Sequence, residues 1–136
     1  MHTTTRAPRK PRVTVIGDGY SAGHKPGERL DCAVRAVMTA ACLTYEQSHA
    51  LFKRHGRRDG RRTFTRTSVA VIREIAPAYR YIGLPGVTVQ GFAELYRSGH
   101  WVVQVSGHML AICDGDIHDW PGRSVYRRVK QAWRIV

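Results

Sequence analysis

The sequence predicts an α+β protein in which helices pack against an antiparallel sheet. Residues 31–41 are small and apolar almost without a break, which is typical of a buried helix. Residues 100–113 are rich in β-branched and apolar side chains, and the Asp114-Gly115 pair that follows favours a tight hairpin turn. Helical segments that come first and strands that come second are the α+β arrangement.

A single domain accounts for the length and composition of the chain. Hydrophobic residues make up 43% of the 136 residues, and a domain of this length buries about two thirds of the surface that its unfolded chain exposes. We assign residues 1–11, which are basic and lack periodicity, to a flexible basic arm, and residues 12–136 to the domain.

The cysteines and the N-terminus favour a soluble, cytoplasmic protein. The three cysteines include no C-x-x-C pair, which argues against a disulfide framework or a zinc ribbon and favours a reducing compartment. No apolar run follows the basic N-terminus, and no stretch of the sequence is long enough to span a membrane.

Basic residues dominate the charge of the chain. There are 22 Lys and Arg against 10 Asp and Glu, a net charge of +12, and the excess gathers in the arm and in residues 53–66 and 127–130. Such a field attracts polyanions, so nucleic acid or another acidic partner is one interpretation. The other is a well-solvated basic surface, which the absence of a recognised nucleic-acid motif favours.

Helices are expected after one short strand in the first half of the chain. A strand at 13–16 precedes a glycine-rich, irregular loop at 17–29. Asp31 is a natural N-cap for the apolar helix. Thr44 and Gln47 have the spacing of a capping box and predict a second, amphipathic helix.

Two more helices and then the strands follow a polar, irregular stretch at 56–66. Thr67 or Ser68 is expected to begin a helix through Ala76, and Thr88 to begin another that Gly99 ends. The predicted strands are 100–106, 108–113 and 117–120, with 125–129 and 132–136 as further strands at the edge of the sheet.

Cys32 is the cysteine whose position favours reactivity. It lies at the start of a helix, where unpaired N–H groups and the positive end of the helix dipole stabilise a thiolate. Cys42 lies at the far end of the same helix, and Cys113 lies among apolar neighbours on a strand, where burial raises the pKa of a thiol. A nucleophilic thiolate also needs a base that a third group orients.

His108 and Asp119 are predicted to supply the base and the orienting group. Four of the seven histidines have surface explanations, and three lie in the strand region. A two-residue turn at Asp114-Gly115 pairs Leu110 with Asp119. His108 shares a face with Leu110, so Asp119 becomes its diagonal neighbour, whereas His118 points to the other face.

The order Cys, His, Asp resembles that of papain-like cysteine peptidases. The chain looks most like compact C39-like proteins that are common in bacteriophages, over about residues 28–136. The resemblance rests on Asp31-Cys32-Ala33-Val34-Arg35-Ala36, Thr44-Tyr45-Glu46, Gly107-His108-Met109-Leu110-Ala111-Ile112 and the segment from Asp114 to Asp119. It implies a papain-like α+β fold with Cys32 as nucleophile, His108 as general base and acid, and Asp119 as the group that orients His108.

By the same resemblance, the protein is expected to cleave a peptide, isopeptide or amide bond in a peptide or protein substrate without a cofactor. The sequence departs from the family at one point, because no glutamine occurs in residues 17–31 to complete an oxyanion hole. A lost donor of this kind costs on the order of a hundredfold in rate. The candidates for a second donor or for a substrate contact are His24, Lys25, Arg29 and Asp31.

Two other interpretations are open to the sequence. One is a catalytically inactive papain-like fold that serves as a phage structural or DNA-associated protein through its arginines. The other is a metal site, but the spacing of the four residues it would use matches no compact zinc motif; they are His100, His108, Cys113 and His118. Trp101, Trp120 and Trp133 are expected in the core or along a groove.

Overall fold

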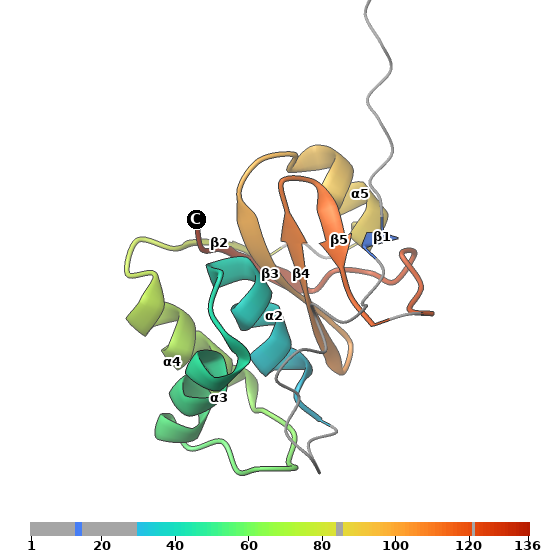
Figure 1. Ribbon diagram of the computed structural model, residues 1–136. Coiled ribbons are helices and arrows are strands. Elements are labelled where there is room, and N and C mark those ends of the chain that lie inside the picture. Colours follow the sequence, from blue (N-terminus) through green and yellow to red (C-terminus); the bar gives the residue numbers. More distant parts are fainter. Residues whose placement is uncertain (1–12, 15–29, 84–85, 121) are drawn as a thin grey trace, which may run out of the picture.

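The structure is a computed structural model, and it describes residues 13–14, 30–83, 86–120 and 122–136 (Figure 1). The predicted arm at 1–11 and the predicted loop at 17–29 lie outside the described residues. The same holds for three of the candidate donors or substrate contacts, namely His24, Lys25 and Arg29.

One sheet forms the centre of the described structure, and its strand order is β1-β5-β4-β3-β6-β2. Every neighbouring pair is antiparallel except β1 and β5, which are parallel. The strands are β1 Val13–Thr14, β2 Arg80–Gly83, β3 His100–Val105, β4 His108–Cys113, β5 Asp116–His118 and β6 Gln131–Arg134. The mixed α+β class predicted from the sequence is therefore confirmed.

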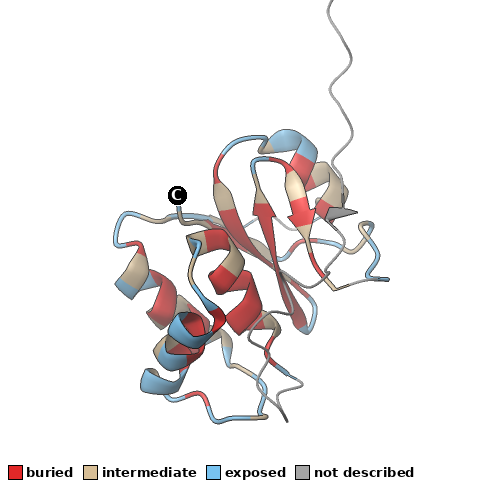
Figure 2. Cartoon of the chain, viewed as in Figure 1, coloured by how far each residue is buried: buried red, intermediate tan, exposed pale blue. Residues whose placement is uncertain are grey.

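Helices cover both faces of this sheet. The first face carries α2 Cys32–Ala41, α3 Tyr45–Arg54 and α4 Thr65–Ile75, whose apolar side chains share a core with Met109 and Ala111. The second face carries α5 Val89–Leu95, which shares a core with Leu110 and Ile112. Because side chains alternate along β4, one strand supplies both cores. Figure 2 shows how continuously the inner side of α2 and the central strands are buried.

Most helix boundaries follow the local rules, with two corrections. Both bonds of the Thr44 and Gln47 capping box form, and the Thr88 side chain caps α5. The prediction that Thr67 or Ser68 begins the next helix is wrong: α4 begins at Thr65, and both residues are buried inside it. The helix after Thr88 ends at Leu95, before the predicted stop at Gly99.

The strand predictions need three corrections. β2 was not predicted, and it pairs along its whole length with β6. Residues 125–129 form no strand; they contribute one isolated bridge between Arg128 and Thr88. The segment predicted to lie at the edge, β6, lies between β3 and β2, because β2 takes the edge position instead.

The hairpin that joins β4 to β5 has the predicted register. Asp114 and Gly115 both have positive φ, and Cys113 faces Asp116 while Ala111 faces His118. Two consecutive positive φ values match the twist of the flanking strands. The predicted next pair does not form, since the ladder ends at Ala111 and His118. The consequence is that β4 begins with a stretch that β5 does not cover.

No helix in the described part of the chain is long and apolar enough to cross a membrane.

Candidate active site

Cys32 is the first residue of α2, as the sequence predicts. The helix continues with small apolar residues that pack tightly on the sheet, so its first turn is held in place by burial rather than by a cap. Asp31 occupies the N-cap position, but its carboxylate makes no capping hydrogen bond. The thiol therefore lies at a helix N-terminus whose N–H groups and dipole favour negative charge.

His108 and Asp119 meet as the hairpin register predicts. The Nε2 atom of His108 lies 2.6 Å from Oδ1 of Asp119, and both side chains are buried. The same Oδ1 accepts the Trp120 N–H at 2.7 Å. Asp119 thus holds both the His108 ring and the backbone that leaves the sheet.

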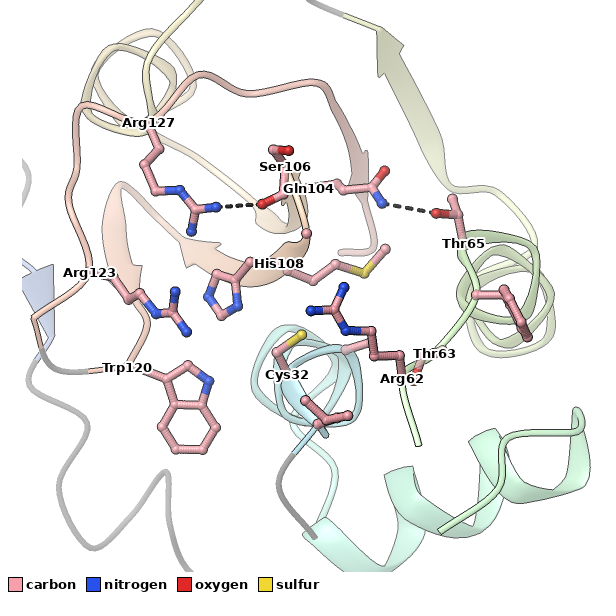
Figure 3. Close-up of a pocket in the computed structure, with 15 residues that line it drawn as sticks. Cys32, Arg62, Thr63, Thr65, Gln104, Ser106, His108, Trp120, Arg123 and Arg127 are labelled. Carbon is pink, nitrogen blue, oxygen red and sulfur yellow. Dashed lines mark hydrogen bonds between the residues drawn. The ribbon is translucent and has the colours of Figure 1, made fainter. Parts of the chain in front are cut away.

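Cys32 lies at the uncovered start of β4. Its sulfur interacts with the His108 side chain and with the backbone of Met109. His108 and Val105 flank a two-residue turn and face each other, so the next N–H along β4, that of Met109, points away from β3. Because β5 ends opposite Ala111, the sulfur takes the position that a further β5 residue would occupy. Figure 3 shows Cys32 and His108 side by side in the cleft.

The pKa values of Cys32 and His108 move in opposite directions. Burial acts against the charged form of each, but the hydrogen bonds and attraction between them outweigh it for Cys32, whose pKa is lowered from the ordinary thiol value of 9.0. The pKa of His108 is raised above its ordinary 6.5, because its bonds to Asp119 and Cys32 exceed the effect of burial. Both shifts favour a thiolate beside an imidazolium.

Replacing Asp119 by Ala is expected to lower the pKa of His108. The carboxylate provides the largest of the effects that raise this pKa, and without it burial weighs more heavily. NMR titration of the imidazole of His108 measures the change, and the alkaline limit of activity should move to lower pH with it. Asp116→Ala is the matched control, because Asp116 acts on His118 instead. An unchanged titration of His108 in Asp119→Ala would contradict this role.

A buried ion pair anchors the start of α2. Asp31 is fully buried and its Oδ2 accepts hydrogen bonds from Arg35 Nε at 3.1 Å and from the Tyr45 hydroxyl at 2.9 Å. Arg35 is also fully buried, and its guanidinium lies over the rings of Tyr45 and Trp120, at 4.9 and 5.1 Å from their centroids. Asp31 is a sequence candidate for substrate contact, but it does not line the cleft and is buried in this cluster instead.

A cleft of about 540 Å³ opens beside Cys32 and His108, within the usual range for ligand-binding sites of roughly 300–1,000 Å³. Trp120, predicted to lie in the core or along a groove, forms part of its wall, whereas Trp101 and Trp133 are buried in the core. Gln104 also lines the cleft. Its amide nitrogen donates to Thr65 at 2.9 Å, and its oxygen accepts from Gln131.

Three arginines that sequence reasoning treated only as surface charge also line the cleft: Arg62, Arg123 and Arg127. They come from two segments far apart in the sequence, so local patterns gave no reason to group them. Arg35 was also missed as a positioning residue. Its spacing of four from Asp31 on one helix is the feature that would have indicated the pair.

The other described cysteines and histidines lie outside the cleft. Burial is the main cause that raises the pKa of Cys113 to about 12, which agrees with the predicted direction. His100 contacts the Ala40 carbonyl and Asp114, and burial lowers the pKa of His118. Among the described residues, no group of three or more His, Cys, Asp or Glu side chains is arranged to hold a metal ion.

Comparisons with known proteins add no assignment. No protein-family model matches the chain, and no similar protein was found among curated proteins or among solved structures.

Proposed function

We propose that this protein is a papain-like cysteine hydrolase that cleaves a peptide, isopeptide or amide bond. The observation that carries the proposal is that Cys32 contacts His108, which in turn contacts Asp119. The pKa of Cys32 is lowered and that of His108 is raised, and both shifts favour a thiolate–imidazolium pair. These three residues come from a helix, a strand and the chain that follows a second strand. Their contact beside one cleft, which Cys32 and His108 line, is typical of a functional site.

The geometry assigns a role to each group in such a reaction. Since His108 Nε2 is bound to Asp119, Nδ1 is the ring nitrogen left to face Cys32. The thiolate attacks the carbonyl carbon, and the imidazolium gives its proton to the nitrogen as the C–N bond breaks. Water then attacks the thioester, His108 takes a proton from that water, and the thiolate is released with the carboxylic acid product. Asp119 keeps the ring oriented throughout.

The oxyanion of the tetrahedral intermediate needs hydrogen-bond donors near Cys32. The N–H groups at the start of α2 are one source of donors. Gln104 lines the cleft, but bonds to Thr65 and Gln131 hold its amide, and we do not assign it the role of the missing upstream glutamine. His24, Lys25 and Arg29 stay candidates for a second donor.

Alkylation of Cys32 tests the proposal without knowledge of the substrate. We expect iodoacetamide near neutral pH to modify Cys32 faster than the exposed Cys42. In the His108→Ala variant, the rate of modification at Cys32 should fall by at least about tenfold. The reason is that burial raises the pKa of the Cys32 thiol, and the hydrogen bond to His108 is the largest effect that lowers it. Trypsin separates the two cysteines, since Arg35 lies between them, so mass spectrometry reads both rates in one sample.

His118→Ala is the matched control, because it removes a sheet histidine that does not act on Cys32. The rate at Cys32 should be retained there. Equal reactivity of Cys32 and Cys42 in the unaltered protein, or a Cys32 rate that does not depend on His108, would reject the hydrolase.

The net charge of +12 supports a second candidate, in which the same fold is catalytically inactive and associates with DNA or a phage structure. This candidate expects DNA retention that falls steeply with salt, together with an unreactive Cys32 thiol. The alkylation experiment therefore separates the two candidates.

A further inference from the structure

The cleft beside Cys32 is lined by arginines that pair with no described carboxylate. Arg62, Arg123 and Arg127 line it, and its described lining includes no Asp or Glu. None of the three forms an ion pair with a described residue, whereas Arg35 and Arg54 pair with Asp31 and Glu74. Cys32 and His108 form a pair with no net charge and Asp119 adds one negative charge, so the three arginines leave the described surroundings of the cleft with a net positive charge.

Arg127 is held so that part of its guanidinium has no described partner. Its Nη2 donates to the Ser106 carbonyl in the turn just before His108. Its Nη1 is buried and has no hydrogen-bond partner among the described residues. A buried charged donor left unsatisfied is costly, and a carboxylate oxygen is the acceptor that satisfies it best. The guanidinium as a whole, held at the cleft wall by Ser106, is a place where an anionic group of a ligand would be stabilised.

The arginines lie on both sides of the reacting pair. In Figure 3, Arg62 lies on one side of Cys32 and His108, and Arg123 and Arg127 lie on the other. The rim also exposes apolar side chains, since Phe64 is 67% and Leu30 is 41% exposed. A segment that crosses the cleft over Cys32 would therefore meet cations on both sides and apolar surface at the rim.

We propose that the cleft binds an acidic peptide segment, whose carboxylates are held by Arg127 and Arg62 on either side of the bond that Cys32 attacks. This inference rests on the proposed hydrolase and names its substrate class. A peptide is favoured over a nucleic acid because Cys32 and His108 are arranged to attack an acyl carbon, which a sugar–phosphate backbone lacks. An acidic peptide has both features: the scissile peptide bond contains the acyl carbon, and an aspartate or glutamate side chain near it carries the negative charge.

Two alkylating reagents that differ in charge measure the local field directly. Iodoacetate carries a carboxylate where iodoacetamide carries a neutral amide, so the ratio of their rates reports attraction for an anion. We expect this ratio to be higher at Cys32 than at Cys42 by about fivefold to tenfold at low salt, and to fall as salt is added. Cys42 lies at the opposite end of α2 and serves as the reference in the same sample.

Arginine variants locate the source of the effect. Arg62→Gln and Arg127→Gln should each lower the Cys32 ratio about twofold or more. Arg61→Gln and Arg128→Gln are the matched controls, because each removes the same charge next to the tested residue but outside the cleft lining, and each should keep the ratio. Arg62 is exposed, so its replacement is not expected to disturb folding. A variant in which iodoacetamide still modifies Cys32 faster than Cys42 has kept the reactive site.

Protection experiments then distinguish the peptide from other anions. A short glutamate-rich peptide should slow modification of Cys32 by iodoacetamide more than a glutamine-rich peptide of equal length. The protection should be lost in Arg127→Gln and kept in Arg128→Gln. Protection by a single-stranded oligonucleotide at lower concentration than the acidic peptide would overturn the inference in favour of nucleic acid.

Failure of this inference is distinguishable from failure of the hydrolase. If Cys32 reacts with iodoacetamide no faster than Cys42, the hydrolase itself is rejected. If that preference is present but the iodoacetate ratio at Cys32 does not exceed that at Cys42, or does not respond to Arg62→Gln and Arg127→Gln, the acidic substrate class is rejected and the hydrolase stands.

Discussion

Replacing Cys32 by Ala is expected to reduce cleavage of peptide substrates to the uncatalysed background, a loss of at least about a thousandfold. The variant removes a thiol that the described structure prepares for nucleophilic attack, because a hydrogen bond to His108 helps to lower its pKa. Mass spectrometry of a peptide library rich in aspartate and glutamate, before and after incubation, detects the new termini that cleavage creates.

The fold should survive this substitution. Cys32 is only partly buried at the start of α2, and alanine is the residue that a helix tolerates best. Cys42→Ala is the matched control, since it removes a thiol from the same helix outside the cleft, and it should retain cleavage. Cleavage that persists in Cys32→Ala but disappears in His108→Ala would mean that another nucleophile performs the attack.

Arg35→Ala is expected to destabilise the protein by about 3–5 kcal/mol. The substitution removes the cation with which the fully buried Asp31 carboxylate is paired, and it also removes the guanidinium that lies over Tyr45 and Trp120. The resulting cost has three parts: the loss of a buried ion pair, a cavity and the loss of contact with an aromatic wall of the cleft. Urea denaturation followed by tryptophan fluorescence measures the free energy of unfolding.

Two comparisons make this result specific to the buried pair. Arg54→Ala breaks an exposed pair with Glu74 and should cost less than about 1 kcal/mol. The double variant Asp31→Leu with Arg35→Met removes both charges and should recover part of the loss, because no unpaired charge is left buried. A free energy of unfolding for Arg35→Ala within about 1 kcal/mol of the unaltered protein would show that solvent or another group compensates Asp31.

The hairpin shows how much of the site local chemistry specifies. Asp114 and Gly115 tolerate positive φ, so the turn has two residues and the register of β4 against β5 follows. That register alone predicts His108 and Asp119 as neighbours, and their 2.6 Å contact confirms it. The position of Cys32 at a helix N-terminus follows equally from local composition.

Long-range packing decided what these patterns left open. The edge strand β2 was missed because only four residues, mostly exposed, form it, and its partner β6 lies about fifty residues away in the sequence. The Thr67 and Ser68 hydroxyls resemble caps locally, yet α4 begins two residues before Thr67 and buries both. Tertiary burial outweighs a capping preference of about 1 kcal/mol.

By itself, the sequence determined the α+β class, the helix that begins at Cys32 and the pairing of His108 with Asp119, because each depends on residues close together along the chain. Only the tertiary structure decided that the start of β4 is left uncovered for the Cys32 sulfur, and that Asp31 pairs with Arg35 instead of facing the cleft. It also decided that Arg62 and Arg127 line one pocket. The physical reason is that these contacts join elements distant in sequence, whose approach is set by burial of the whole core rather than by any local preference.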